Sequence, residues 1–195
     1  MKKLLITGFE PFGGEAINPA LEAVLRLPDT MDGATIVKLQ APVVYDASAE
    51  TVLAAMEREQ PDAVLCVGQA GGRNAITPER IAINMDDASS ADNSGEVRTD
   101  TPIAQNGPAA YFATLPVRKM AQAMVDAGLP GSVSYSAGAF VCNDTMYAVL
   151  HRYHGTPVRA GFIHVPFLPQ QAKEGVPSMA LEEIVKAREI CIEQL

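Results

Sequence analysis

The chain alternates between short apolar runs and longer stretches whose apolar residues recur every three or four positions. Continuous apolar runs are typical of strands buried on both faces of a parallel sheet. They predict strands over 2–7, 33–43, 62–70 and 158–169, with weaker patterns over 79–85 and 131–137. Helical spacing predicts helices over 18–28, 46–61, 116–128, 142–154 and 178–195.

Two predicted helices carry recognisable end signals. Asn18 is the expected N-cap of the first, with Pro19 at its first helical position. Asp46 or Ser48 is expected to cap the second, which Pro61 should end. Strands that alternate with helices predict a three-layer α/β/α sandwich with a mainly parallel, twisted sheet. Such folds place their sites at the carboxyl ends of the strands.

Composition narrows the class of protein. The 195 residues are 48% hydrophobic and 19% charged, which suits one globular domain spanning 1–195. A net charge of −8 without a basic run argues against nucleic acid or an anionic membrane as the main partner. No apolar stretch reaches the roughly 20 residues that cross a bilayer. The start "MKKLLITGFEPFGG" fits a first strand better than a signal peptide.

The number of cysteines indicates the cellular compartment, and a long polar segment indicates a functional or mobile region. Three cysteines, an odd number, indicate free thiols in a reducing environment, so we expect a cytoplasmic protein. Residues 86–107 form a long polar stretch between predicted elements. A structureless segment of that length inside a compact domain is usually functional or partly mobile.

Cys142 lies where a predicted helix begins, after a turn at Gly138. Unpaired N–H groups and the helix dipole at such a position lower the pKa of a thiol and favour the nucleophilic thiolate. The same N–H groups can stabilise an oxyanion. A free cysteine is more often a small buried hydrophobe. That is our interpretation of Cys66, inside a strand, and of Cys191, on the last helix.

His164 and Glu79 are predicted to share the sheet edge with Cys142. His164 ends the last predicted strand, whereas His151 and His154 would lie roughly 13–18 Å along the helix from the thiol. Glu79 follows the third predicted strand. The alternative to a catalytic role is that its carboxylate is simply solvated or paired with an arginine. Together the three form a possible nucleophile, base and orienting acid. No spacing suits a metal site.

Glycines and aromatic residues cluster after two of the strands. The glycines around Gly13 do not match phosphate-loop or dinucleotide spacing. Gly68, Gly71 and Gly72, at the end of the third predicted strand, allow the backbone to come close to another group. Phe9 and Phe12 could pack a turn or line an apolar pocket. Gln69 offers an amide donor and an amide acceptor at a strand end.

Several short sequence motifs, in order along most of the chain, resemble those of the pyroglutamyl peptidase I family of cysteine peptidases. They are "LITGFEPFGG" with "NP", "VGQAGGR", "ERIAIN", "DN.G", "SAGAFVCN" and "GFIHVPFLPQQ". The resemblance implies a single α/β/α sandwich like that of the nucleoside phosphorylase and hydrolase-like group. It implies removal of N-terminal pyroglutamate (5-oxoproline) from peptides through a thioester, without metal or cofactor, by an enzyme that is often a homotetramer.

The resemblance also implies roles for particular residues. Cys142 would be the nucleophile, His164 the general base and Glu79 the orienting acid. The positions that it associates with the substrate pocket are Phe9, Phe12, Gln69 and Phe140.

The chain departs from the family pattern at three positions. Ser89 stands where family members often have arginine, Ala91 where they have proline, and Asp144 where many have histidine. Asp144 is expected to stabilise the helix start, but its charge can also raise the pKa of the nearby thiol. Two alternatives follow: another thiol amidase on the same scaffold, or a relative that binds pyroglutamate but turns it over weakly.

Overall fold

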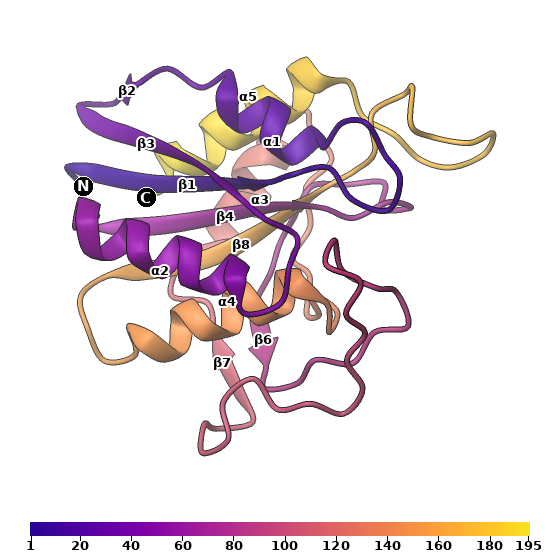
Figure 1. The fold of residues 1–195 in the computed structure, drawn as a ribbon. Helices are drawn as coiled ribbons and strands as arrows, with labels where there is room; N and C mark the ends of the chain where they lie inside the picture. The colour runs from indigo at the N-terminus through magenta and orange to yellow at the C-terminus, as the bar shows by residue number, and fades with distance from the viewer.

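The computed structural model describes all 195 residues, which are arranged around a six-stranded sheet (Figure 1). The strand order is β2-β3-β1-β4-β8-β5. The strands are β1 (Lys3–Phe9), β2 (Thr30–Met31), β3 (Ala34–Ala41), β4 (Ala63–Gln69), β5 (Thr77–Pro78) and β8 (Arg159–Val165). The four central strands run parallel, and the short edge strands β2 and β5 pair antiparallel.

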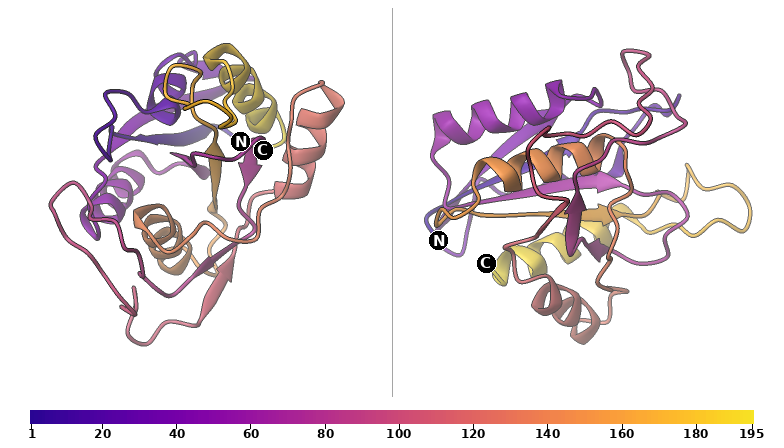
Figure 2. Two further views of the ribbon diagram at one scale, coloured as in Figure 1. Left: turned by 90° about the vertical axis from the view of Figure 1, so that its right-hand side faces the viewer. Right: turned by 90° about the horizontal axis from the view of Figure 1, so that it is seen from below.

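Five helices cover both faces of this sheet (Figures 1 and 2). They are α1 (Pro19–Leu25), α2 (Ala47–Glu59), α3 (Val117–Asp126), α4 (Val141–Arg152) and α5 (Leu181–Glu193). Helices α2 and α4 pack against one face, whereas α1, α3 and α5 gather on the other. The predicted α/β architecture with a mainly parallel sheet is therefore confirmed.

Side-chain alternation along the buried strands divides the core into two. In β1, Leu4 and Ile6 point toward α1 and α5, and Leu5 points toward α2. Every residue of β4 is buried, as expected of a central parallel strand covered on both faces. Successive residues of β4 or β8 therefore point alternately to the two layers of helices.

Close packing of α1 against β1 depends on Gly8. A Cβ at this position would lie 2.6 Å from the Cα of Leu21, so only glycine lets the helix approach. Asn18 caps α1 as predicted, since its side chain accepts a 3.0 Å hydrogen bond from the N–H of Ala20. The same side chain donates to the carbonyl of Glu10, which ties the helix start to the loop after β1.

Two predicted strands differ from the structure. Of residues 79–85, only β6 (Ile81–Ile83) is a strand, and it pairs with β7 (Ala110–Phe112) in a separate two-stranded sheet. Residues 131–137 make only isolated bridges, through Gly131 and Ser134. These bridges join Gly131 to Ile76 and Ser134 to Glu79, on either side of the two-residue strand β5, so the segment lies along the free edge of β5 without forming a continuous strand.

The start of α2 also differs from the prediction. Neither Asp46 nor Ser48 caps the helix with its side chain, because each binds elsewhere. Asp46 has a positive φ of 57° and pairs with Arg98, while the hydroxyl of Ser48 accepts a hydrogen bond from Thr145. The helix ends at Glu59, just before Pro61, as predicted.

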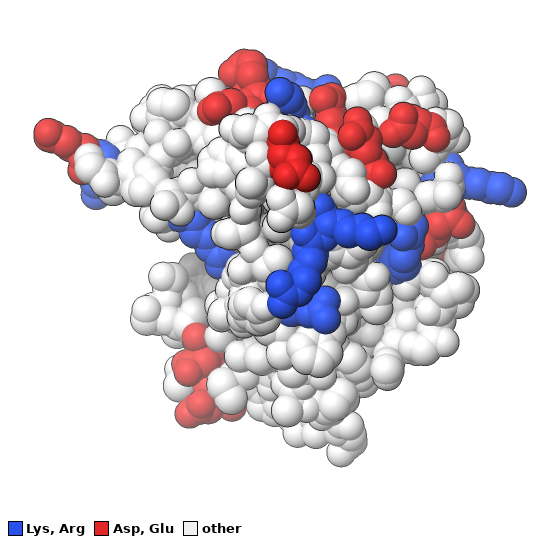
Figure 3. Space-filling view, turned by 180° about the vertical axis from the view of Figure 1, so that it is seen from behind, with Lys and Arg blue, Asp and Glu red and all other residues white.

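The surface carries charges of both signs. Figure 3 shows acidic side chains along the upper part of the rear face, basic ones across its middle, and a mostly uncharged lower part. None of the helices is both long and apolar enough to span a bilayer.

Candidate active site

A buried hydrogen bond joins His164, near the end of β8, to Glu79, which follows β5. His164 Nδ1 lies 2.7 Å from Oε1 of Glu79, and the carboxylate is fully buried. Arg73 Nη1 lies 2.6 Å from the same oxygen, and Arg73 also binds the hydroxyl of Thr77 and the carbonyl of Ser136. One guanidinium thus anchors the carboxylate that contacts the imidazole.

This contact fixes the tautomer of His164. Burial disfavours the Glu79 carboxylate, but the hydrogen bond and charge of His164 and the charge of Arg73 outweigh it, so the pKa of Glu79 lies below its usual value. Burial lowers the pKa of His164 despite the opposing effect of Glu79, so its ring is neutral at pH 7. A carboxylate only accepts, so Nδ1 carries the proton and Nε2 keeps a free lone pair.

Cys142, the second residue of α4, places its sulfur on the same face of the sheet as His164. A Cβ built on Gly68 would lie 3.0 Å from the Cys142 Sγ and 2.9 Å from the ring of Phe162. Gly68 is the register partner of His164 on neighbouring parallel strands, so side chains at the two positions point to the same face. The thiol and the imidazole therefore lie together at the carboxyl edge of β4 and β8.

The environment of Cys142 differs from the predicted one. Burial and the charge of Glu79 raise the pKa of the thiol to about 12, so the expectation of a resting thiolate at the helix start is wrong. The helix start is still present: the carbonyl of Phe140 accepts from Asn143 and Asp144, and the N–H of Cys142 has no acceptor in the chain. Two neutral groups, a thiol and an imidazole, thus lie beside one free N–H donor.

A cavity of about 450 Å³ opens beside the start of α4. Phe12 and Phe140 form its aromatic wall, with ring centroids 6.4 Å apart, and residues 87–91 close the other side. Tyr45 supports Phe140 from behind in an edge-on contact at 5.4 Å. The lining is aromatic on one side; on the other it consists of small and polar residues and includes the exposed carboxylate of Asp87.

Two of the four predicted pocket residues do not line this cavity. Phe9 is 2% exposed and packs on Phe162 in the core, because it lies within β1 rather than in the loop that follows. Gln69 lies four positions after Leu65 on β4, so both side chains point to the same face of the sheet, which is the face opposite to that of His164. There its Oε1 accepts a 3.0 Å hydrogen bond from Gln171.

The structure adds one residue that the sequence interpretation missed. Arg73 stands in the word "VGQAGGR", but its partner Glu79 is six positions away and the chain between them turns through a loop. Spacing within a regular helix or strand gives no signal for such a pair. A cationic residue in a glycine-rich stretch at a strand end was the only indication. Of the five other predicted site residues, His164 and Glu79 are in contact, Cys142 lies on the same face of the sheet, and Phe12 and Phe140 line the cavity.

The fold and this arrangement define the chain as an α/β protein of the thiol hydrolase class. A thiol, an imidazole and a carboxylate lie at the carboxyl edge of its parallel sheet, and these are the functional groups that nucleophilic hydrolysis uses. The family model described as pyroglutamyl peptidase matches residues 2–195. The chain therefore belongs to the pyroglutamyl peptidase family.

Similar proteins agree with this assignment. The chain is 57% identical over 188 residues to the pyrrolidone-carboxylate peptidase of Levilactobacillus brevis, covering 94% of this chain and 92% of that protein. The crystal structure of pyroglutamyl peptidase I from Bacillus amyloliquefaciens matches with a TM-score of 0.95 and 44% identity, over 99% of this chain and 94% of that one. The pyrrolidone carboxyl peptidase of Thermococcus litoralis matches with a TM-score of 0.94 and 39% identity, over 100% and 93% of the two chains.

Proposed function

We propose that this protein removes N-terminal pyroglutamate from peptides and that Cys142, His164 and Glu79 carry the reaction. The activity is that of the family to which the chain belongs. The observation that supports the residue assignment best is the shared position of the thiol and the Glu79-bound imidazole on one face of the sheet.

In this proposal the proton moves only when the substrate is attacked. The neutral Cys142 thiol gives its proton to Nε2 of His164 as sulfur bonds to the pyroglutamyl carbonyl carbon. Glu79 then stabilises the imidazolium through Nδ1–H, and Arg73 keeps the carboxylate in place. The free N–H of Cys142 donates to the oxyanion. His164 next protonates the leaving amine, and water hydrolyses the thioester.

The cavity at Phe12 and Phe140 is the proposed site for the lactam ring. Pyroglutamate has no free amine, so its pocket needs apolar walls and a few polar groups rather than a carboxylate for an ammonium. Phe9 lies outside this wall: it packs on Phe162, whose ring centroid is 4.8 Å from that of His164, so it supports the imidazole rather than the cavity. The Gln69 side chain is held by Gln171 on the other face, so its amide is not proposed to contact the ring.

The setting of the enzyme is also a proposal. We infer a cytoplasmic enzyme, supported by three cysteines that are all free thiols. We also infer a homotetramer, which rests on the family resemblance alone. Size-exclusion chromatography with light scattering tests the assembly.

One assay tests the proposed function. Pyroglutamyl-aminomethylcoumarin should be cleaved in the presence of reductant, while the alanyl and prolyl amides of the same fluorophore should not. Preferential cleavage of another acyl amide would favour a different thiol amidase. A protein that binds 2-pyrrolidone but cleaves nothing would favour the weakened relative, the candidate that Ser89 in the cavity lining supports.

A further inference from the structure

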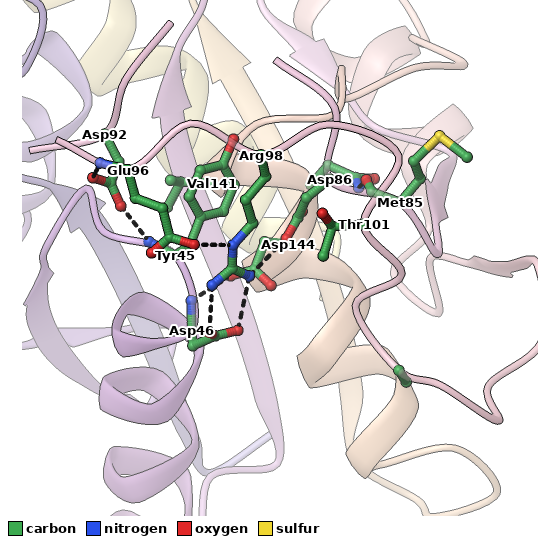
Figure 4. A network of polar contacts seen from close by, with 12 residues as sticks. Tyr45, Asp46, Met85, Asp86, Asp92, Glu96, Arg98, Thr101, Val141 and Asp144 are labelled. Atoms are coloured by element: carbon green, nitrogen blue, oxygen red, sulfur yellow. Dashed lines mark hydrogen bonds and ion pairs between the residues drawn. The ribbon is translucent and has the colours of Figure 1, made fainter. Parts of the chain in front are cut away.

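Arg98 joins the start of α2 to its own 86–107 segment close to the proposed pocket (Figure 4). Its guanidinium binds both carboxylate oxygens of Asp46, at 3.1 and 2.5 Å, where α2 begins. It also binds Asp86 at 3.0 Å and Glu96 at 2.6 Å, both in the 86–107 segment. A planar fork with several donors can hold carboxylates in different directions at once, which a lysine ammonium does not reproduce.

The burial of this cluster makes Arg98 hard to replace. The Arg98 side chain is only 13% exposed and that of Asp86 is fully buried. Asp86 and Asp144, close beside it, each keep one buried carboxylate oxygen without a hydrogen-bond partner. Negative groups therefore outnumber the single guanidinium, and Arg98 is the cation on which their arrangement depends.

Two routes lead from Arg98 to the cavity. Its guanidinium carbon lies 4.6 Å from the centre of the Tyr45 ring, and Tyr45 packs edge-on against Phe140, a wall of the cavity. Its carbonyl accepts a 3.0 Å hydrogen bond from the N–H of Ala88, in the opposite wall. One residue thus contacts the supports of both walls.

We propose that Arg98 is a positioning residue for the peptidase reaction: it fixes the distance between the Phe140 wall and the 87–91 wall of the pocket. This inference rests on the proposed function, because it takes that cavity as the lactam site. Arg98 touches neither the thiol nor the imidazole pair in the structure. Its loss should therefore weaken substrate binding and leave the chemical step largely intact.

The test is Arg98→Lys, which keeps the charge and removes the fork. We expect KM for pyroglutamyl-aminomethylcoumarin, and Ki for 2-pyrrolidone, to rise about tenfold, since small misplacements of binding groups are costly. kcat and the rate of Cys142 alkylation by iodoacetamide should stay within about twofold. The matched control is Arg152→Lys, because Arg152 also pairs with a carboxylate and lies over a tyrosine ring, but on the exposed surface.

A second variant covers the case in which Arg98→Lys does not fold. Asp46→Asn removes one charge partner at a side chain that is 61% exposed, and should raise KM about threefold. Unchanged KM and Ki in the folded variants, with an active wild type, would overturn the role of Arg98 while leaving the proposed function standing. An equal fall of kcat and alkylation rate without a change in Ki would overturn it too. A wild type without pyroglutamyl amidase activity would instead contradict the proposed function itself.

Discussion

His164 Nδ1 and Glu79 Oε1 lie 2.7 Å apart in a pair that is almost wholly buried, although 85 positions separate the two residues in the chain. The carboxylate holds the proton on Nδ1 and so leaves the lone pair of Nε2 free to act as a base. The pair lies on the face of the sheet that also carries the Cys142 sulfur. The sheet therefore places the base, and the start of α4 brings the thiol to the same face.

Glu79→Gln should reduce kcat by roughly a thousandfold, because an amide can hold the wrong tautomer and does not stabilise an imidazolium. Glu79 favours the charged form of His164, so removing its charge should lower the pKa of that ring further. The acid limb of the wild-type kcat/KM profile should have its midpoint below 6.5, and that of the variant should lie lower still. A midpoint that moved upward would contradict the assignment.

Phe12→Ala and Phe9→Ala should separate pocket residues from core residues. Phe12 lines the cavity and is half-buried, so its loss should raise KM with a change in unfolding free energy below about 1 kcal/mol. Phe9 is 2% exposed and packs on Phe162, so its loss should cost about 3–5 kcal/mol of stability. Urea denaturation and steady-state kinetics measure the two effects. Unchanged substrate binding in Phe12→Ala would make Phe12 a packing residue only.

Asp144→Asn should stabilise the protein at alkaline pH. Burial and the charges of Asp86 and Asp46 raise the pKa of Asp144 to about 7, so the folded state binds a proton that the unfolded state releases near pH 4. Stability from this group is complete at acid pH and is lost as pH rises through 7. The variant should gain roughly 2–4 kcal/mol at pH 8 and almost nothing at pH 4. Chemical denaturation at both values tests this, and an equal gain at both would exclude titration as the cause.

Ser89→Arg should raise kcat/KM if the departure from the family pattern limits the rate. Ser89 lines the cavity opposite Phe140, where a guanidinium could donate to the substrate carbonyl or to its oxyanion. A gain of about tenfold with 2-pyrrolidone binding unchanged would indicate transition-state stabilisation. Ser90→Arg, at the next position of the same lining, is the matched control. Equal effects of both variants would point to general electrostatics instead.

The sequence was informative where one local pattern decides the structure. Continuous apolar runs identified β1, β4 and β8. Parallel strands bring their carboxyl ends to one edge, which accounts for the position of His164 at the end of β8. Glu79 instead follows the antiparallel strand β5, and Cys142 follows a segment that is not a strand, so the predicted strands did not by themselves explain the grouping of these three residues. The strand predicted at 131–137 is reduced to two bridges because its neighbour β5 is only two residues long, which no pattern within 131–137 reports.

The finer features of the site depend on contacts between distant segments. The pairing of Arg73 with Glu79, and the ion pairs of Arg98, link loops whose paths are set by the whole fold. The high pKa of Cys142 likewise follows from burial, which the helix start alone does not reveal. The orientation of Gln69, by contrast, could have been predicted from the sequence. Side chains alternate along β4, so Gln69 must point to the same face as Leu65, away from the site.

The most direct test of the account replaces one sulfur. Cys142→Ser is compared with Cys191→Ala, which alters a buried thiol on α5 away from the site. Hydrolysis of pyroglutamyl-aminomethylcoumarin is measured for both, with circular dichroism to show that each variant is folded. The account predicts that the serine variant loses activity by at least roughly four orders of magnitude while the alanine variant keeps it. A folded Cys142→Ser protein that cleaves the substrate at the wild-type rate would contradict the assignment of Cys142 as nucleophile.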